Sequence, residues 1–428
     1  MTGRVASQGV RERLRSLLLG DLAFRDGDRG HPLHTLHAFA ARFPAPLPRH
    51  FIQGLSEPGD VVLDPMAGSG ATLLEGWLLS RRVVGVDLDP LAVRLCAAKT
   101  TRLEPTVVAT AGHRVVAAAS LLVRLGDPLT HLRGRLDEAT RAFLDYWFRP
   151  DTQRELAALV LAIEQEPDAR VKTLLEALFS SVIVTKSGGV SLARDLAHSR
   201  PHRVEDKPPA SAIKKFEDLL CRAVHAFGAL PDASLGWSTV VRGDCRSLPL
   251  ADGSVDLIVT SPPYANALDY VRAHKFSLAW LGEPIQRLGT LRGRYIGAER
   301  WDGVEGAVLP EAVEATIVGV SEVDAGRARV LDKYFRDMAL ALREMYRVLR
   351  RGRAAAVVIG PSTMRGIRVA THEHLAAIAE GTGFEVAGVV KRTLDRDRRM
   401  MPARWQGNGQ STIEQRIHEE FVIGLVKP

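Results

Sequence analysis

Short runs of β-branched and other apolar residues recur along the chain, and each run ends at a small, acidic or hydroxyl-bearing residue. Nearly continuous apolar runs of this length are typical of strands buried on both faces, as in a parallel sheet. The clearest runs are Val61–Leu63 before Asp64, Arg82–Val86 before Asp87, Val240–Val241 before Gly243-Asp244, Asp256–Val259 before Thr260-Ser261, and Ala355–Ile359 before Gly360. We therefore predict five strands with chemically useful residues at their carboxyl ends.

Helical patterns separate these runs. Ala71–Ser80 follows the first run and Pro90–Thr100 the second, and Asp332–Leu349 carries apolar residues at i, i+3 and i+4 before Gly352. The remaining segments are a predicted helix, Thr371–Glu380, and two predicted closing strands, Phe384–Val390 and Phe421–Val426. The alternation of strand and helix predicts an α/β fold with a doubly wound, seven-stranded sheet.

Two stretches depart from this alternation. Residues 105–236 are rich in helix formers and predict a mostly helical insertion between the second and third strands. Residues 282–329 carry many glycines and charges and predict a long surface loop, whose length favours a function. The expected organisation is an N-terminal extension (1–30), a first core half (31–104), the insertion (105–236) and a second core half (237–428).

Composition narrows the class of protein. The 428 residues are 46% hydrophobic and 25% charged, which excludes wholesale disorder and suggests two or three domains or one domain with a large insertion. Three scattered cysteines argue against a disulfide scaffold or a cysteine-based zinc site. We expect no membrane-spanning stretch and no signal peptide, hence a cytoplasmic protein. A net charge of +7 permits a nucleic-acid partner without establishing one.

The first chemically informative segment is a strand, a glycine-rich turn and a helix, Asp64-Pro65-Met66-Ala67-Gly68-Ser69-Gly70-Ala71. Glycines let a backbone approach a ligand closely, and the following helix offers free N–H groups. The turn is neither a Walker loop nor GxGxxG. Asp87 ends the next strand, where a carboxylate can accept hydrogen bonds from ribose hydroxyls. The alternative role for Asp87 is a helix N-cap, for which Asp89, just before Pro90, is better placed.

The second segment is a strand that ends in Thr260-Ser261-Pro262-Pro263-Tyr264. Two prolines remove two N–H donors and stiffen the backbone, which leaves carbonyl acceptors beside a hydroxyl and an aromatic face. That combination suits a planar ring bearing an NH₂ group. The alternative is a proline turn after a core strand.

Together the two segments resemble the DNA amino-methyltransferases, which methylate exocyclic nitrogens of bases with S-adenosylmethionine. The resemblance covers about residues 30–105 and 238–428, including the helix end Arg347–Gly352. It implies a Rossmann-like methyltransferase sheet and double-stranded DNA as partner, and it leaves open a separately encoded restriction endonuclease. In that family Ser-Pro-Pro-Tyr is mostly associated with cytosine N4, and Asp- or Asn-Pro-Pro-Tyr with adenine N6.

The resemblance also implies site residues. Asp64, Gly68 and Gly70 would surround the methionine part of the cofactor, Asp87 the ribose, and Asp244 the adenine edge. The full cofactor set is Phe39, Asp64, Pro65, Ala67, Gly68, Gly70, Asp87 and Asp244, and the catalytic set is Ser261, Pro262, Pro263 and Tyr264.

The expected mechanism positions a flipped-out base against the methyl donor. The Ser261 hydroxyl and the Pro262 carbonyl would accept hydrogens of the amine, and Tyr264 would stack on the base. The glycine turn precedes Ser-Pro-Pro-Tyr, the reverse of the order in many such enzymes. The alternatives are adenine N6 methylation of DNA, guanine N2 methylation of RNA, and a non-catalytic nucleic-acid-binding relative.

Histidines and basic residues complete the candidates. His31, His34 and His37 could suggest a metal site, but a loop beside the cofactor pocket is the favoured interpretation. Contacts to DNA phosphates are predicted for Lys186, Arg194, Arg200 and Arg203, the alternative being a solvated surface. A phosphate contact and a solvated surface are likewise the alternatives for Arg392, Arg396, Arg398, Arg399 and Arg404. If the first group does not bind DNA, the next candidates for DNA contacts are Arg287, Arg292, Arg294 and Arg300.

Overall fold

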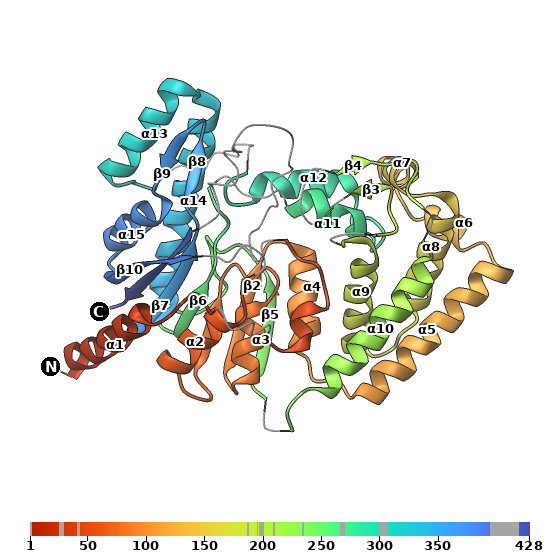
Figure 1. Cartoon of the computed structure of the whole chain (residues 1–428), viewed down its shortest axis with the longest axis horizontal. Helices are drawn as coiled ribbons and strands as arrows, with labels where there is room; N and C mark the ends of the chain where they lie inside the picture. Colours follow the sequence, from red (N-terminus) through yellow and green to blue (C-terminus); the bar gives the residue numbers. More distant parts are fainter. Residues whose placement is uncertain are drawn as a thin grey trace.

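A seven-stranded sheet forms the centre of the computed structural model, with helices on both faces (Figure 1). The structure describes all residues except 1, 25–29, 41–42, 186–187, 195, 197–200, 209, 233–234, 266–269, 299–306 and 394–418. The strand order is β10-β11-β7-β6-β1-β2-β5. The strands are β1 (Val61–Asp64), β2 (Arg82–Asp87), β5 (Trp237–Arg242), β6 (Val255–Thr260), β7 (Leu349–Ile359), β10 (Glu385–Thr393) and β11 (Glu419–Val426). Strands β7, β6, β1, β2 and β5 run parallel, and β11 runs antiparallel to both of its neighbours. The predicted Rossmann-like α/β sheet is confirmed.

Successive residues of the central strands point to opposite faces of the sheet, and each face has its own apolar core. Val62 and Leu257 belong to one buried cluster, whereas the next residues, Leu63 and Ile258, belong to the other. The helices that flank the strands are α1 (Thr2–Leu19), α2 (Pro46–Leu55), α3 (Ala71–Leu78), α4 (Pro90–Lys99), α14 (Ala325–Val348) and α15 (Thr371–Thr382). Helix α1 packs on β7, β10 and β11 with the fully buried side chains of Leu14 and Leu18, so this helix contributes to the core.

The segment between α4 and β5 lies beside the sheet as a bundle of helices (Figure 1). In its described part the elements are α5 (Pro105–Leu125), α6 (Pro128–Arg133), α7 (Glu138–Trp147), α8 (Pro150–Glu164), α9 (Ala169–Ile183), α10 (Ala212–Gly228) and a small ribbon of β3 (Ala193–Arg194) and β4 (His202–Arg203). Helix α9 packs against α4, which joins the bundle to the core.

Helix α5 is long and apolar enough to cross a membrane by length and composition, so the expectation that no stretch reaches this limit is wrong. One such helix is weak evidence for a membrane span. Its buried face packs on α8 and α10, where a Cβ on Gly112 would lie only 2.2 Å from Leu220 Cδ1. The apolar side of α5 therefore serves, at least in part, the core of the bundle.

The described residues of the stretch 282–329, which are 282–298 and 307–329, do not form the long irregular loop that its glycines and charges predicted. They contain α12 (Ile285–Arg294), α13 (Glu311–Val323) and the first residues of α14, which begins at Ala325 rather than Asp332. The prediction is wrong because apolar residues spaced along these helices, such as Leu288 and Leu291 or Val313 and Val320, are buried. Three more short elements are η1 (Pro32–Thr35), α11 (Tyr270–Leu278) and the hairpin of β8 (Ser362–Met364) and β9 (Ile367–Val369).

Candidate active site

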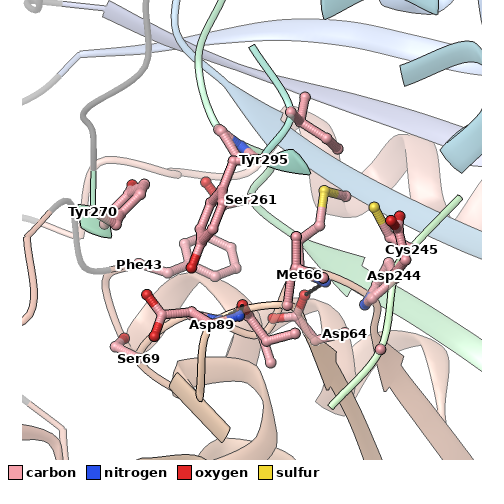
Figure 2. A pocket seen from close by; sticks show the side chains of 18 of the residues that line it. Phe43, Asp64, Met66, Ser69, Asp89, Asp244, Cys245, Ser261, Tyr270 and Tyr295 are labelled. Atoms are coloured by element: carbon pink, nitrogen blue, oxygen red, sulfur yellow. Dashed lines mark hydrogen bonds between the residues drawn. The ribbon is translucent and has the colours of Figure 1, made fainter. Parts of the chain in front are cut away.

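A pocket opens at the carboxyl ends of the parallel strands, between the glycine turn and Ser-Pro-Pro-Tyr (Figure 2). Chain connections leave the sheet in opposite directions between β1 and β6, and ligands of open α/β sheets bind at such a switch point. The pocket is lined by Phe39, Phe43, Asp64, Pro65, Met66, Ala67, Gly68, Ser69, Asp87, Leu88, Asp89, Gly243, Asp244, Cys245, Ser261, Pro263, Tyr270, Arg294, Tyr295 and Ile296.

The glycine turn needs its glycines for different reasons. Gly68 and Gly70 both have positive φ, 48° and 75°, a backbone conformation that favours glycine. Gly68 lines the pocket, and a Cβ there would meet the Phe39 ring at an ordinary 3.6 Å. Gly70 is the N-cap of α3, and a Cβ there would lie 2.9 Å from Cys96 Sγ on α4. Gly70 thus allows α4 to pack closely and does not line the pocket itself.

Asp87 both lines the pocket and braces the glycine turn. Its Oδ2 accepts a hydrogen bond from the Gly68 N–H at 2.7 Å, and its Oδ1 accepts one from the Asp89 N–H at 2.8 Å. Burial, reinforced by repulsion from Asp89, raises the pKa of Asp87 to about 7. The side chain is therefore poised to gain charge when a cationic ligand enters.

Asp64 connects the cofactor segment to the catalytic segment. Thr260, the residue before Ser261, donates its hydroxyl hydrogen to Asp64 Oδ1 at 2.7 Å. Burial raises the pKa of Asp64 to about 6, against the opposing effect of hydrogen bonds from Thr260 and the Met66 N–H. Strands β1 and β6 are neighbours, so this hydrogen bond holds the ends of the two motifs together.

Asp244 is held at the far wall by Arg246. The guanidinium donates to both oxygens, Nε to Oδ1 at 2.9 Å and Nη2 to Oδ2 at 2.7 Å. Burial alone would raise the pKa of Asp244, but the hydrogen bonds from Arg246 lower it below its ordinary value. Arg246 is itself anchored on the buried Asp337 at 2.6 Å. Asp244 therefore offers a fixed carboxylate edge to the pocket.

The Ser-Pro-Pro-Tyr segment divides between the pocket and the protein interior. Ser261 and Pro263 line the pocket, whereas Pro262 is buried and does not line it. Tyr264 does not line the pocket either, because its hydroxyl donates to Glu420 Oε1 at 2.7 Å. Burial and the nearby Glu420 carboxylate raise the pKa of Tyr264 well above its usual range, so the phenol stays protonated and donates.

Several pocket residues were missed by sequence reasoning. Tyr270 and Tyr295 add aromatic walls (Figure 2), and the Phe39 ring stacks on Tyr270 with centroids 5.6 Å apart. Tyr295 comes from residues 282–329, whose length had indicated a function, whereas no local pattern marks Tyr270.

Asp89 is the predicted N-cap of α4, which is confirmed by its hydrogen bond from the Leu91 N–H at 2.8 Å. Its second oxygen lies 2.5 Å from Nδ1 of the buried His274, a pairing that no local signal predicted. Burial alone would raise the pKa of Asp89, but the attraction of His274 lowers it. This pair ties the loop after β2 to α11, the helix that follows Ser-Pro-Pro-Tyr.

The histidine triplet takes structural positions. His34 pairs with Glu75 at 2.6 Å and His37 with Ser180 at 2.9 Å, both buried, while His31 contacts the Ala229 carbonyl. Within the part of the chain that the structure describes, no group of three or more His, Cys, Asp or Glu side chains could hold a metal ion.

The basic residues predicted to contact DNA phosphates lie in different environments. Arg194 is exposed on β3, whereas Arg203 on β4 pairs with Glu205 at 2.6 Å and lies over the Tyr146 ring. Arg392 is buried against Glu420, so it is neither a phosphate contact nor a solvated residue, and both alternatives are wrong for it. Candidates outside the described residues are Lys186, Arg200, Arg300, Arg396, Arg398, Arg399 and Arg404.

The lining of the pocket fits S-adenosylmethionine. Four carboxyl groups, from Asp64, Asp87, Asp89 and Asp244, line the pocket and would face the sulfonium and ammonium charges of this cofactor. Aromatic rings, among them Tyr270 and Tyr295, and aliphatic side chains such as Leu88 and Ile296 suit its adenine ring.

Comparison with known proteins agrees with this fit. A family model described as DNA methylase (N6_N4_Mtase) matches residues 21–99. The chain is 23% identical over 375 residues to "Type II methyltransferase M.MvaI" of Kocuria varians, covering 82% of this chain and 81% of that protein. It is 21% identical over 297 residues to "Type II methyltransferase M.BsoBI" of Geobacillus stearothermophilus, covering 62% of this chain and 56% of that protein. A solved S-adenosylmethionine-dependent methyltransferase from Methanosarcina mazei aligns with 88% of this chain and 96% of its own at 11% identity and a TM-score of 0.33.

The relatives in sequence carry the assignment, and the pocket supplies its physical basis. Asp64 and Asp87 at the ends of β1 and β2, and Asp244 just after β5, line the pocket with carboxyl groups that would attract a cationic sulfonium cofactor. The match over residues 21–99 and the two relatives together support an S-adenosylmethionine-dependent DNA amino-methyltransferase similar to the N4/N6 family.

Proposed function

We propose that this protein methylates the N4 amine of cytosine within a specific sequence of double-stranded DNA. The observation that carries the proposal is Ser261, whose hydroxyl-bearing side chain lines the cofactor pocket directly after β6. A serine at this place, in the first position of Ser-Pro-Pro-Tyr, favours cytosine N4 over adenine N6. Adenine N6 remains the second candidate within the same family.

The residues of the chain would act by positioning rather than by strong acid or base chemistry. S-adenosylmethionine supplies an electrophilic methyl group when bound. Ser261 Oγ and the Pro262 carbonyl accept hydrogens of the base amine, which turns the nitrogen lone pair toward the cofactor side of the pocket. The amine sheds its proton more easily after transfer, so no general base with a shifted pKa is required.

The target base has to leave the duplex to reach this pocket. Tyr264 follows the two prolines and is half-buried, so part of its side chain remains exposed for contact with a base. We assign the stacking contact to that exposed part, because Glu420 and Gly360 occupy the rest of its surroundings.

The helical bundle would supply DNA contacts. The β3–β4 ribbon lies, with α7, α11 and α12, along the same side of the molecule as the carboxyl ends of the strands (Figure 1). Exposed Arg194 of this ribbon is suited to a phosphate contact, which positions a duplex without reading its sequence.

Nucleoside mass spectrometry of DNA methylated by the purified protein tests the base. We expect N4-methylcytosine, and N6-methyladenine alone would refute the cytosine assignment. RNA incubated in parallel should stay unmethylated. The relatives are named Type II methyltransferases, so we extend the proposal to a modification role with a separately encoded endonuclease as partner. DNA methylated by this chain would then resist that endonuclease.

A further inference from the structure

Tyr264 reaches across a neighbouring strand to a residue that lies outside the pocket. The sheet order β11-β7-β6 places β7 between the strand that precedes Tyr264 and the strand that carries Glu420. The Tyr264 hydroxyl nevertheless donates to Glu420 Oε1 at 2.7 Å. The contact joins residues 156 positions apart in the chain.

Gly360 makes this crossing possible. It directly follows β7, and a Cβ placed on it would lie 2.5 Å from Tyr264 Cε2 and 2.9 Å from Cζ. Real Cβ atoms do not approach this closely, and the ring cannot bend away as a flexible chain could. The Tyr264 ring therefore occupies the space that a side chain at position 360 would fill.

Arg392 holds Glu420 from the other side. The two residues face each other as a register pair of β10 and β11, and Arg392 Nη1 lies 3.2 Å from Glu420 Oε2. The Arg392 side chain is 1% exposed and that of Glu420 10%. Each oxygen of Glu420 therefore has its own partner, Tyr264 for Oε1 and Arg392 for Oε2.

A buried ion pair of this kind needs a reason other than stability. Replacing such a pair by well-packed apolar residues is often neutral or stabilising, so stability alone would not call for it. The pair does, however, fix an acceptor at one place, and a tyrosine hydroxyl uses that acceptor. The orientation of Tyr264 is what the arrangement specifies.

We infer that Glu420, held by Arg392, is a positioning residue that fixes Tyr264 across Gly360 and thereby fixes the Ser-Pro-Pro-Tyr segment, whose Ser261 and Pro263 line the pocket. Pro262 and Pro263 have restricted φ angles, so anchoring Tyr264 limits where the Pro262 carbonyl and the Ser261 hydroxyl can lie. Glu420 does not line the pocket and acts only through Tyr264. The inference rests on the proposed role of this segment in methyl transfer.

The test compares methyl transfer to DNA with binding of the cofactor. Wild type, Glu420→Ala, Glu420→Gln and Tyr264→Phe are assayed with labelled S-adenosylmethionine and unmethylated DNA for kcat and KM. Calorimetry gives the Kd for S-adenosylmethionine. The matched control is Glu419→Gln, the same change at the neighbouring residue, which pairs with Lys391 and Arg368 near the surface.

We expect Glu420→Ala to lower kcat at least tenfold while the Kd for S-adenosylmethionine stays within twofold. Glu420→Gln keeps an acceptor oxygen and should recover most of the loss, and Glu419→Gln should match wild type. Tyr264→Phe and Glu420→Ala remove the same hydrogen bond. The double variant Tyr264→Phe/Glu420→Ala should therefore be no slower than the slower single variant. A kcat within twofold of wild type for Glu420→Ala, or multiplying losses in the double variant, would overturn the inference.

A second variant, Gly360→Ala, tests the same inference without changing Glu420. If Glu420→Ala does not fold, Gly360→Ala displaces the Tyr264 ring from the other side and leaves the Glu420–Arg392 pair intact. It should lower kcat at least tenfold at an unchanged Kd for the cofactor, and an unchanged kcat overturns the inference. A wild type that transfers no methyl group to DNA overturns the proposed function and this inference with it. An active wild type with an equally active Glu420→Ala overturns this inference alone.

Discussion

Thr260 Oγ1 donates a hydrogen bond to Asp64 Oδ1 at 2.7 Å, and both side chains are buried. The first residue stands directly before Ser-Pro-Pro-Tyr and the second directly before the glycine turn. The two halves of the active site, 196 positions apart in the chain, are thus joined at the ends of the neighbouring strands β1 and β6. Cofactor binding and base positioning share this connection.

Replacing Thr260 by valine should weaken both the fold and the activity. Valine keeps the shape but removes the shorter of two hydrogen bonds to the buried Asp64 Oδ1, leaving the one from the Met66 N–H at 3.2 Å, at a cost of about 1 kcal/mol. We expect urea unfolding to show this loss, together with weaker binding of S-adenosylmethionine in calorimetry. Thr260→Ser keeps the hydroxyl and should lie close to wild type, and equal stability of valine and wild type would contradict the role of the hydrogen bond.

Binding of S-adenosylmethionine should strengthen as the pH rises from about 5.5 to about 7.5. The pKa values of Asp64 and Asp87, raised by burial to about 6 and about 7, leave these side chains partly neutral at the acidic end, and ionisation adds attraction for the cationic cofactor. Calorimetry in buffers of different ionisation enthalpy should show protons released on binding in this range. An affinity independent of pH would contradict this account.

The same shifts should make the free protein less stable as the pH rises over this range. A carboxyl group whose pKa is raised in the folded state binds more protons there than in the unfolded chain, where it ionises near pH 4. The contributions of Asp64 and Asp87 to the free energy of unfolding should therefore fall between about pH 4 and about pH 7. Asp64→Asn should flatten this dependence in urea unfolding, and an unchanged slope would argue against the raised pKa.

The two glycines of the turn should respond differently to alanine. Gly70→Ala combines a positive φ with a contact 2.9 Å from Cys96 Sγ, so we expect a loss of about 2 kcal/mol or more. Gly68→Ala meets only the Phe39 ring at 3.6 Å and should lose about 1 kcal/mol from backbone strain. Thermal and urea unfolding measure both, and the reverse order would contradict the packing of α3 on α4.

Gly70→Asp should abolish measurable binding of S-adenosylmethionine. The substitution forces a charged side chain against Cys96 and displaces the turn that Asp87 braces. Circular dichroism of the purified variant separates this local effect from unfolding. A folded Gly70→Asp protein that binds the cofactor like wild type would refute the assignment of the turn.

Arg194→Ala should weaken binding to cognate and random duplexes alike. Loss of one phosphate contact should reduce the slope of log K against log salt by about 0.9. Arg203→Ala should have a smaller effect on that slope, because Glu205 already partly neutralises Arg203. Lys214→Ala, on α10 and paired with Glu217, is the control within the same bundle. An unchanged slope for Arg194→Ala would show that the β3–β4 ribbon is a solvated surface and does not contact DNA.

Some features of this protein follow from local sequence. The strands before Asp64, Asp87 and Ser261 and the cap at Asp89 were predictable, because periodicity, glycine and proline restrict the backbone within a few residues. The two motifs also indicated the resemblance to the DNA amino-methyltransferases and its cofactor.

Other features were decided only by tertiary structure. Glu420 and Arg392 carry no local mark of their contact with Tyr264, and Arg392 looked like a surface charge. The pairing of His274 with Asp89 was equally hidden. These contacts depend on the order and register of strands far apart in the chain, and local preferences do not specify which distant side chains a strand will bring together.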